Sequence, residues 1–298
     1  MEKVAIMCDS MAEISQEEAK RIGIKVVPMP FMINGEEYLE DINLSHDDFY
    51  HMLENDASVS TSQPSIAYVS SIWDELLETY DSIVYIPMSS GLSKSYECAN
   101  NYANANYDGK VFVVDIKRMS SPLRRAVYDA MRLRNLGYTA KEIKDILLEV
   151  WAQSRVFIML DTLYYLKKGG RITAAAAAIG GMLKLKPILV IKGEKLDKYK
   201  MRNRTLDNGI ELLIEAAKAT IEEFKSIDGR VDNIRYEIAY AKRSNDDALK
   251  LEKRMREEFG QDIEILTDRL ALAVACHTGE GAVGIGVTKE IPDKYLKK

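Results

Sequence analysis

The sequence predicts an α/β protein of two domains. Its 298 residues are about twice the usual length of a domain. Short runs rich in β-branched residues alternate with longer stretches in which apolar residues recur at helical spacing. We therefore expect a doubly wound, mostly parallel sheet in residues 1–155 and an α/β domain of α+β character in residues 156–298.

The elements of the first half follow a β-α-β rhythm. Strand candidates are residues 4–7, 25–29, 83–86 and 111–114. The last two are apolar throughout, which is typical of parallel strands covered on both faces. Residues that favour helix starts mark the helices: Ser15 with Glu18, Ser45 with Asp48, Pro64, and Thr139 with Glu142.

The pattern changes in the second half. A strand at 156–160 and a helix around 162–168 precede an alanine-rich helix. Later strands are expected at 188–191, 234–241, 263–266 and 283–287, with amphipathic helices at about 205–225 and 245–259.

Composition argues against several classes of protein. The net charge of −5 disfavours a general nucleic-acid binder. Cys8, Cys98 and Cys276 lie far apart, which fits a reducing compartment and no zinc ribbon. The N-terminus lacks the layout of a secretory signal, so we expect a cytoplasmic protein. The longest uncharged apolar run, 172–183, is shorter than the roughly 20 residues of a spanning helix, so no membrane insertion is expected.

Charge is unevenly distributed. Residues 167–204, the basic segment, carry eleven Lys or Arg and only Glu194 and Asp197 as acids, a net charge of +9. The segment could present one cationic face to an anionic partner. Because it spans a helix, a loop and a strand, its charges could equally point in several directions.

Three apparent motifs fail on context. Residues 279–284 match GxGxxG, but a strand follows where the motif needs a helix. Residues 91–95 faintly resemble a P-loop, but Ser93 stands where the glycine before the lysine must be, and Met88 stands where the first glycine should lie. His46 and His51 are five residues apart and fall on different helix faces, so they do not form a metal pair. No metal or cofactor is expected.

Four polar clusters lie next to predicted strands or helix starts. They are Asp9-Ser10, residues 61–65, residues 89–93 and His277-Thr278-Gly279. The carboxyl ends of parallel strands meet at one edge of a sheet, where helix N-termini and hydroxyls can bind an anion. Thr61, Ser93 and His277 could hold a carboxylate by hydrogen bonds alone. Taken singly, each residue also fits ordinary capping or packing.

The sequence strings at 61–65, 89–93, 160–172, 186–189 and 277–286 together resemble the DegV family. The resemblance runs in order over nearly the whole chain, which makes the chain one DegV-like unit. It implies a long-chain fatty acid bound between two α/β domains. It also implies that the protein, like FakB-type members, presents the carboxylate to a kinase that makes acyl phosphate.

The resemblance also implies roles for particular residues. Thr61 and Ser93 match positions that hydrogen-bond the carboxylate, and His277 matches a histidine near the same head group. Ser10, Ser62 and Gly91 are expected to support the site. Arg202 matches a position tied to kinase docking.

Some positions depart from the family pattern. Met11 stands where the family has threonine, and Lys94 stands where it has a small residue. Residues 116–125 replace a serine and the glycines of the next helix start. Glycines let the backbone and an acyl chain approach closely, so bulky residues here bear on chain length and pocket depth.

Two other functions fit parts of the pattern. A serine hydrolase would use Ser90 or Ser93 with His277 and Asp9, although the chain has no GxSxG motif. A lipid-sensing regulator would bind nucleic acid or anionic membrane through the basic segment, and its binding would depend strongly on salt.

Overall fold

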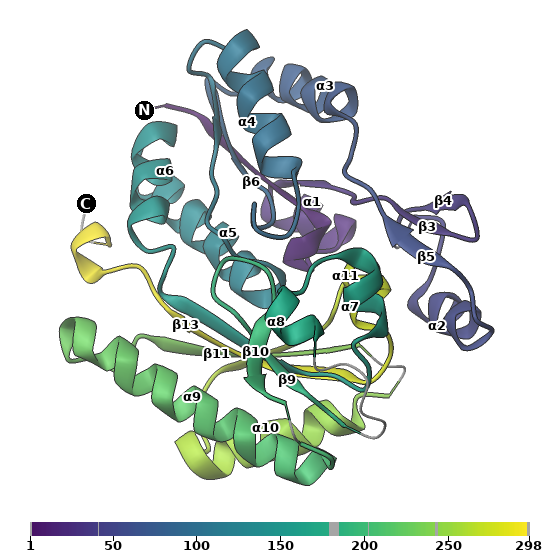
Figure 1. Cartoon of the computed structure of the whole chain (residues 1–298). Helices are drawn as coiled ribbons and strands as arrows, with labels where there is room; N and C mark the ends of the chain where they lie inside the picture. The colour runs from purple at the N-terminus through teal and green to yellow at the C-terminus, as the bar shows by residue number, and fades with distance from the viewer. Residues whose placement is uncertain (1, 41, 179–184, 202, 242–243, 297–298) are drawn as a thin grey trace. The chain divides into compact units, whose positions relative to one another are not determined.

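The computed structural model describes residues 2–40, 42–178, 185–201, 203–241 and 244–296. The chain forms two compact units (Figure 1). Unit 1 comprises Met1–Pro30, Ser62–Ala152 and Ile291–Lys298, and unit 2 comprises Phe31–Thr61 and Gln153–Glu290. The predicted division after residue 155 assigns residues 31–61 and 291–298 differently. As a boundary between independently folding domains, it stays a prediction.

Unit 1 is built on a parallel sheet with the strand order β2-β1-β6-β7. Its strands are β1 (Val4–Asp9), β2 (Lys25–Val27), β6 (Ser82–Ile86) and β7 (Val111–Val113). Its helices are α1 (Gln16–Ile22), α3 (Ile66–Leu77), α4 (Ser95–Asn106), α5 (Ser120–Asn135), α6 (Ala140–Glu149) and the 3-10 turns η1 (Ser10–Ala12) and η2 (Asp293–Tyr295).

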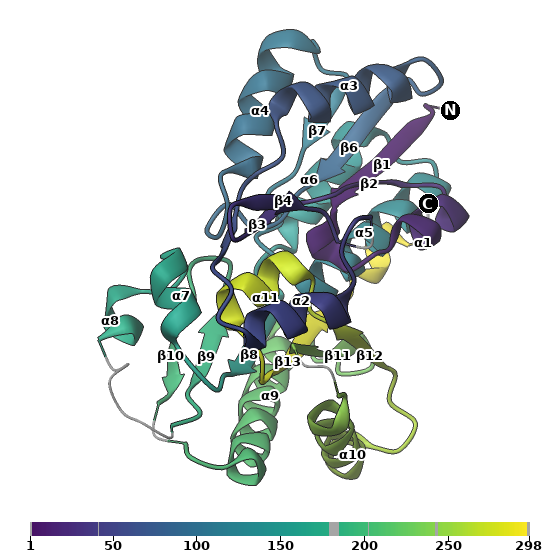
Figure 2. The ribbon, with the colours of Figure 1, turned by 90° about the vertical axis from the view of Figure 1, so that its right-hand side faces the viewer.

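The apolar strands of unit 1 are buried because helices pack on both faces of the sheet. Trp73 of α3 and Ala99 of α4 pack with Met7 and Tyr85 of the sheet. Helices α5 and α6 contact β1, β6 and β7 (Figure 2). The predicted capping box at the start of α6 is present, with Thr139 and Glu142 each bonding the backbone of the other.

Unit 2 is built on a mixed sheet with the strand order β10-β9-β8-β13-β11-β12, in which only β11 and β12 pair in parallel. Its strands are β8 (Ser154–Met159), β9 (Ile188–Ile191), β10 (Asp197–Lys200), β11 (Ile234–Ala241), β12 (Ile265–Arg269) and β13 (Ala282–Lys289). Its helices are α7 (Tyr164–Gly169), α8 (Ala174–Ala177), α9 (Leu206–Asp228), α10 (Asp246–Phe259) and α11 (Leu272–Thr278).

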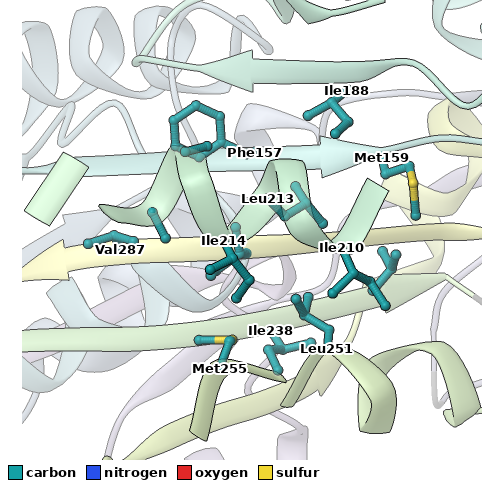
Figure 3. Packing of buried hydrophobic residues seen from close by; sticks show 14 of the residues in the cluster. Phe157, Met159, Ile188, Ile210, Leu213, Ile214, Ile238, Leu251, Met255 and Val287 are labelled. Carbon is teal, nitrogen blue, oxygen red and sulfur yellow. The ribbon is translucent and has the colours of Figure 1, made fainter. Parts of the chain in front are cut away.

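One face of this sheet packs on α9 and α10. Leu213 and Ile214 of α9 meet Phe157, Ile238 and Val287 of the strands, as Figure 3 shows. The alternation of apolar residues along β8, β11 and β13 supplies this core face. The predicted fold class is confirmed: the N-terminal half holds a parallel sheet and the C-terminal half a mixed sheet.

Residues 31–61 form a small substructure that the sequence pattern did not reveal. Strands β3 (Phe31–Ile33), β4 (Glu36–Tyr38) and β5 (Val59–Thr61) pair antiparallel in the order β4-β3-β5, with α2 (His46–Glu54) between β4 and β5. Each strand has three residues, which is too short to show a period. The predicted start of α2 is confirmed, because Ser45 accepts a hydrogen bond from the backbone N–H of Asp48.

None of the helices in the described ranges combines the length and the apolar character that a membrane crossing requires.

Lys289 provides a test of the core of unit 2. Its side chain is 2% exposed, and Nζ donates to the carbonyl of Phe224 and to Asp228 at 2.9 and 2.5 Å, at the C-terminal end of α9. Lys289→Met leaves both acceptors without a donor, so we expect it to lower the free energy of unfolding by about 3 kcal/mol in denaturant titrations. Lys218→Met is the control: it breaks a more exposed pair from the same helix and should cost less than about 1 kcal/mol. Equal losses would contradict this assignment.

Candidate ligand-binding site

Two of the three predicted carboxylate donors meet in unit 2. Thr61 is the last residue of β5, and His277 lies in the last turn of α11. Thr61 Oγ1 and His277 Nε2 are 2.8 Å apart, a hydrogen bond between residues 216 positions apart in the chain. A hydroxyl and an imidazole are thus held together at the end of a short strand.

The element that carries His277 differs from the prediction. Residues 277–279 were expected in a loop beside a strand or before a helix, but Leu272–Thr278 is a helix and His277 closes it. Helix α11 packs against β5 and α7. With only seven residues, α11 is too short to show helical periodicity.

Two glycines allow the close packing around His277. A Cβ at Gly169 would overlap with His277 Nδ1, so only glycine lets the ring lie against the end of α7. Gly279 has φ +69°, and a Cβ there would lie 2.6 Å from the ring of Tyr165. The glycines of the string at 277–286 therefore serve close packing at this point, and not a dinucleotide.

The electrostatics of the site keep His277 neutral. Burial, and to a lesser degree the positive charge of Arg171, lowers the pKa of His277 to about 4. Arg171 donates to the carbonyl of Gly169, which places its charge on the Gly169 side of the ring. The imidazole is therefore neutral at pH 7.

The ring nitrogens have different surroundings. Nδ1 is buried and has no hydrogen-bond partner among the described residues. Because Arg171 favours a lone pair on that side of the ring, we assign the proton to Nε2. Nε2–H then donates to Thr61 Oγ1, and the Thr61 hydroxyl keeps its own proton for a further acceptor.

In unit 1, polar residues follow adjacent parallel strands, as predicted. Asp9 ends β1 and accepts hydrogen bonds from the backbone N–H groups of Met11 and Met88 at 3.1 and 2.8 Å. Burial raises the pKa of Asp9 to about 7. Asp115, just after β7, accepts from the Ser90 hydroxyl at 2.5 Å. These two carboxylates fix the loop that follows β6.

Ser93, the third predicted donor, belongs to this loop of unit 1. Its Oγ accepts a hydrogen bond from the backbone N–H of Ser95 at 3.2 Å and lies 2.8 Å from Ser95 Oγ. With Ser95 donating, the Ser93 hydroxyl also has a proton left to give. The Ser93 hydroxyl, like the Thr61 hydroxyl, is therefore left as a hydrogen-bond donor.

The expected supporting residues shape the backbone. Ser10 Oγ accepts from Met29 N at 3.0 Å, Ser62 N donates to the Pro30 carbonyl, and Gly91 N donates to Ser89 Oγ. Arg202, the predicted docking residue, lies outside the described residues. Contact of Ser10, Ser62 and Gly91 with a ligand stays a prediction.

The residues that depart from the family pattern are accommodated by their local surroundings. Met11 is 2% exposed and fills the core, whereas Lys94 is exposed. Ser120 has φ +58°, a left-handed conformation that favours glycine. Its hydroxyl donates to Glu13 at 2.5 Å, which offsets part of that strain.

The geometry gives the hydrolase alternative no support. A Ser-His-Asp triad needs a carboxylate on the second ring nitrogen of the histidine. His277 Nδ1 has no such partner in the described ranges, and the oxygens of Asp9 accept from backbone N–H groups. Within those ranges, no His, Cys, Asp and Glu side chains gather into a group that could hold a metal ion.

Sequence reasoning missed Gly169, Arg171 and Asp115 as parts of the site. The first two lie in the string at 160–172 that carries the family resemblance, so their identity was visible and their role was not. Both act on His277 over more than a hundred residues of chain, which no local pattern can encode.

Known proteins resemble this chain over nearly its full length. The model of the DegV family, described as uncharacterised proteins, matches residues 3–290. A DegV domain-containing protein of Staphylococcus aureus (strain N315) is 31% identical over 295 residues, which cover 97% of this chain and 100% of the relative.

Solved structures agree with this similarity. A DegV family protein from Thermus thermophilus, described by its fatty acid binding, is 26% identical with a TM-score of 0.85 and covers 96% of this chain and 99% of its own. DegV of Bacillus subtilis, a fatty acid binding protein, is 25% identical with a TM-score of 0.83 and covers 97% and 100%. Because the family model and the relatives span almost all of its sequence, this chain belongs to the DegV family.

Proposed function

We propose that this chain binds a long-chain fatty acid and presents its carboxylate to a fatty acid kinase that forms acyl phosphate. The Thr61 and Ser93 hydroxyls donate to the carboxylate, and His277 supports Thr61. The observation that carries the proposal is the 2.8 Å hydrogen bond between Thr61 and His277. The choice of a fatty acid rests on similar proteins described as fatty acid binding.

The donor arrangement suits an anion. A hydroxyl that already accepts a hydrogen bond is left as a donor, and its donation is strengthened by polarisation from the group behind it. Nε2–H of His277 bonds to the Thr61 hydroxyl in this way, and the Ser95 hydroxyl bonds to the Ser93 hydroxyl. A carboxylate offers only acceptors, so both hydroxyls are matched to it.

Tail and head contribute differently to binding. Burying about fourteen methylenes yields on the order of 11 kcal/mol before the cost of association. Each hydrogen bond to the charged carboxylate adds roughly 1.5 to 3 kcal/mol, much of which offsets desolvation. The tail therefore supplies most of the affinity, and the hydroxyls fix the orientation.

The basic segment is the proposed docking surface for the kinase. Its described lysines lie on α7, just before β9, on the β9–β10 connection and on β10, and those exposed to solvent are Lys167, Lys168, Lys192, Lys195, Lys198 and Lys200. An acidic face on the kinase would complement them and speed association. Arg202, which lies outside the described residues, is proposed to contribute to kinase docking.

Thr61→Val tests the carboxylate contact. Valine keeps the shape and removes the hydroxyl, so the affinity for palmitate should fall about ten- to one-hundred-fold in calorimetric titration of the delipidated protein. Thr61→Ser keeps the donor and should stay within about threefold of the original chain. Ser93→Ala should behave like Thr61→Val. Equal affinities of the valine and serine variants would refute the contact.

The depressed pKa of His277 predicts a specific pH dependence of stability. Between pH 6.5 and about 4 the unfolded chain binds a proton at this histidine that the folded chain does not, so the free energy of unfolding falls as the pH falls. Between pH 7.5 and pH 5 the loss from this residue is about 2 kcal/mol. Denaturant titrations should show that His277→Gln removes this part of the pH dependence. An unchanged slope would argue against a buried neutral imidazole.

Charge reversal tests the docking surface. Lys192→Glu with Lys195→Glu should slow phosphorylation of bound palmitate by a fatty acid kinase about tenfold or more at low salt, while palmitate affinity stays unchanged. Arg202→Ala is expected to slow phosphorylation in the same assay. Lys250→Glu with Lys253→Glu on α10 is the control of equal charge change and should have little effect. Equal slowing by both pairs would indicate a general charge effect, and strong binding of the original chain to nucleic acid would favour the regulator.

A further inference from the structure

We propose that Glu40 is a positioning residue for the carboxylate site: it fixes the start of α11 so that His277 meets Thr61. This inference rests on the proposed function of the Thr61–His277 pair. Glu40 lies on the connection between β4 and α2, and its side chain is 15% exposed.

Glu40 supplies a cap that α11 lacks locally. Its Oε2 accepts a hydrogen bond from the backbone N–H of Leu272 at 2.9 Å, across 232 positions of the chain. The N-cap residue of α11 is Ala271, which has no side-chain acceptor. The first N–H groups of a helix need an acceptor, and a carboxylate also favours the positive end of the helix dipole.

The second oxygen of Glu40 is held as well. Oε1 lies 2.7 Å from Nε2 of His46, the first residue of α2, whose side chain is 16% exposed. The carboxylate therefore bridges α2 and α11. His46, which failed as a metal ligand in the sequence, has a structural partner here.

The position of Glu40 can reach His277 because α11 is short. Leu272 and His277 are five residues apart in a helix of two turns, so a shift at the first N–H is passed to the imidazole. Burial and then the charge of Glu40 raise the pKa of Cys276, the neighbour of His277, to about 12. A hydrogen bond of 2.8 Å is lost once the atoms separate beyond about 3.5 Å.

The first experiment compares two variants of Glu40 in the full chain. Glu40→Ala removes the cap and should lower palmitate affinity about five- to thirty-fold, the range of a lost N-cap. Glu40→Gln keeps an acceptor for Leu272 and should stay within about threefold. Ala271→Ser in the Glu40→Ala background supplies a local cap and should restore most of the affinity. If the alanine variant does not fold, a Gln variant that binds as weakly as Thr61→Val would overturn the proposal.

A double-mutant cycle separates positioning from general stability. In the His277→Gln background, Glu40→Ala should change palmitate affinity by less than about twofold, because its effect passes through His277. A loss that persists undiminished in that background would overturn the proposal. A purely structural role would lower the melting temperature and leave affinity at 20 °C unchanged.

The imidazole signals of the ligand-free protein give a readout that needs no fatty acid. With ¹⁵N-labelled histidine, His277 should show a protonated Nε2, and Glu40→Ala should shift or broaden that signal while Glu40→Gln preserves it. An unperturbed His277 signal in Glu40→Ala would refute positioning. If the original chain bound no palmitate, the proposed function would fail while this measurement still decided the role of Glu40.

Discussion

The hydrogen bond between His277 and Thr61 is the interaction on which the candidate site depends. A threonine hydroxyl can donate or accept, and it becomes a committed donor when a neighbour already donates to it. His277 acts as that donor here as a neutral ring with its proton assigned to Nε2. Burial and Arg171 keep the ring neutral, and Gly169 permits the ring to come close enough. The chemistry of one hydroxyl therefore rests on residues from α7, β5 and α11.

In unit 1, two carboxylates hold the loop that carries Ser93. Asp9 and Asp115 stand at the ends of parallel strands where an anion is expected, and free carboxylates there would repel it. Their oxygens are instead occupied by the backbone N–H groups of Met11 and Met88 and by the Ser90 hydroxyl. The acids thus hold the loop that carries Ser93, and the burial that raises the pKa of Asp9 weakens its charge further.

Much of the fold was predictable because local rules dominate it. The capping pair Thr139 and Glu142 and the apolar run at 188–191 predict α6 and β9 directly. The strands of residues 31–61 and helix α11 escaped prediction, since three to seven residues carry no period and the cap of α11 comes from Glu40. The candidate site residues Thr61, Ser93 and His277 were visible as hydroxyls and a histidine in a family pattern. Their pairing was not, because a contact across 216 positions leaves no local trace.

The neutrality of the proposed donors bears on the proposed carrier function. A lysine or arginine facing the carboxylate would form a strong charge-assisted pair and draw electron density from the oxygens that attack phosphate. In the proposed site, neutral hydroxyls would orient the same oxygens with less attraction, and the tail would supply the affinity instead. Arg171 fits this division because its charge lies behind His277, bonded to the Gly169 carbonyl. There it favours the proton on Nε2 of the imidazole. Under the proposed function, the hydroxyls alone would face the head group, and the carboxylate would stay reactive toward a kinase.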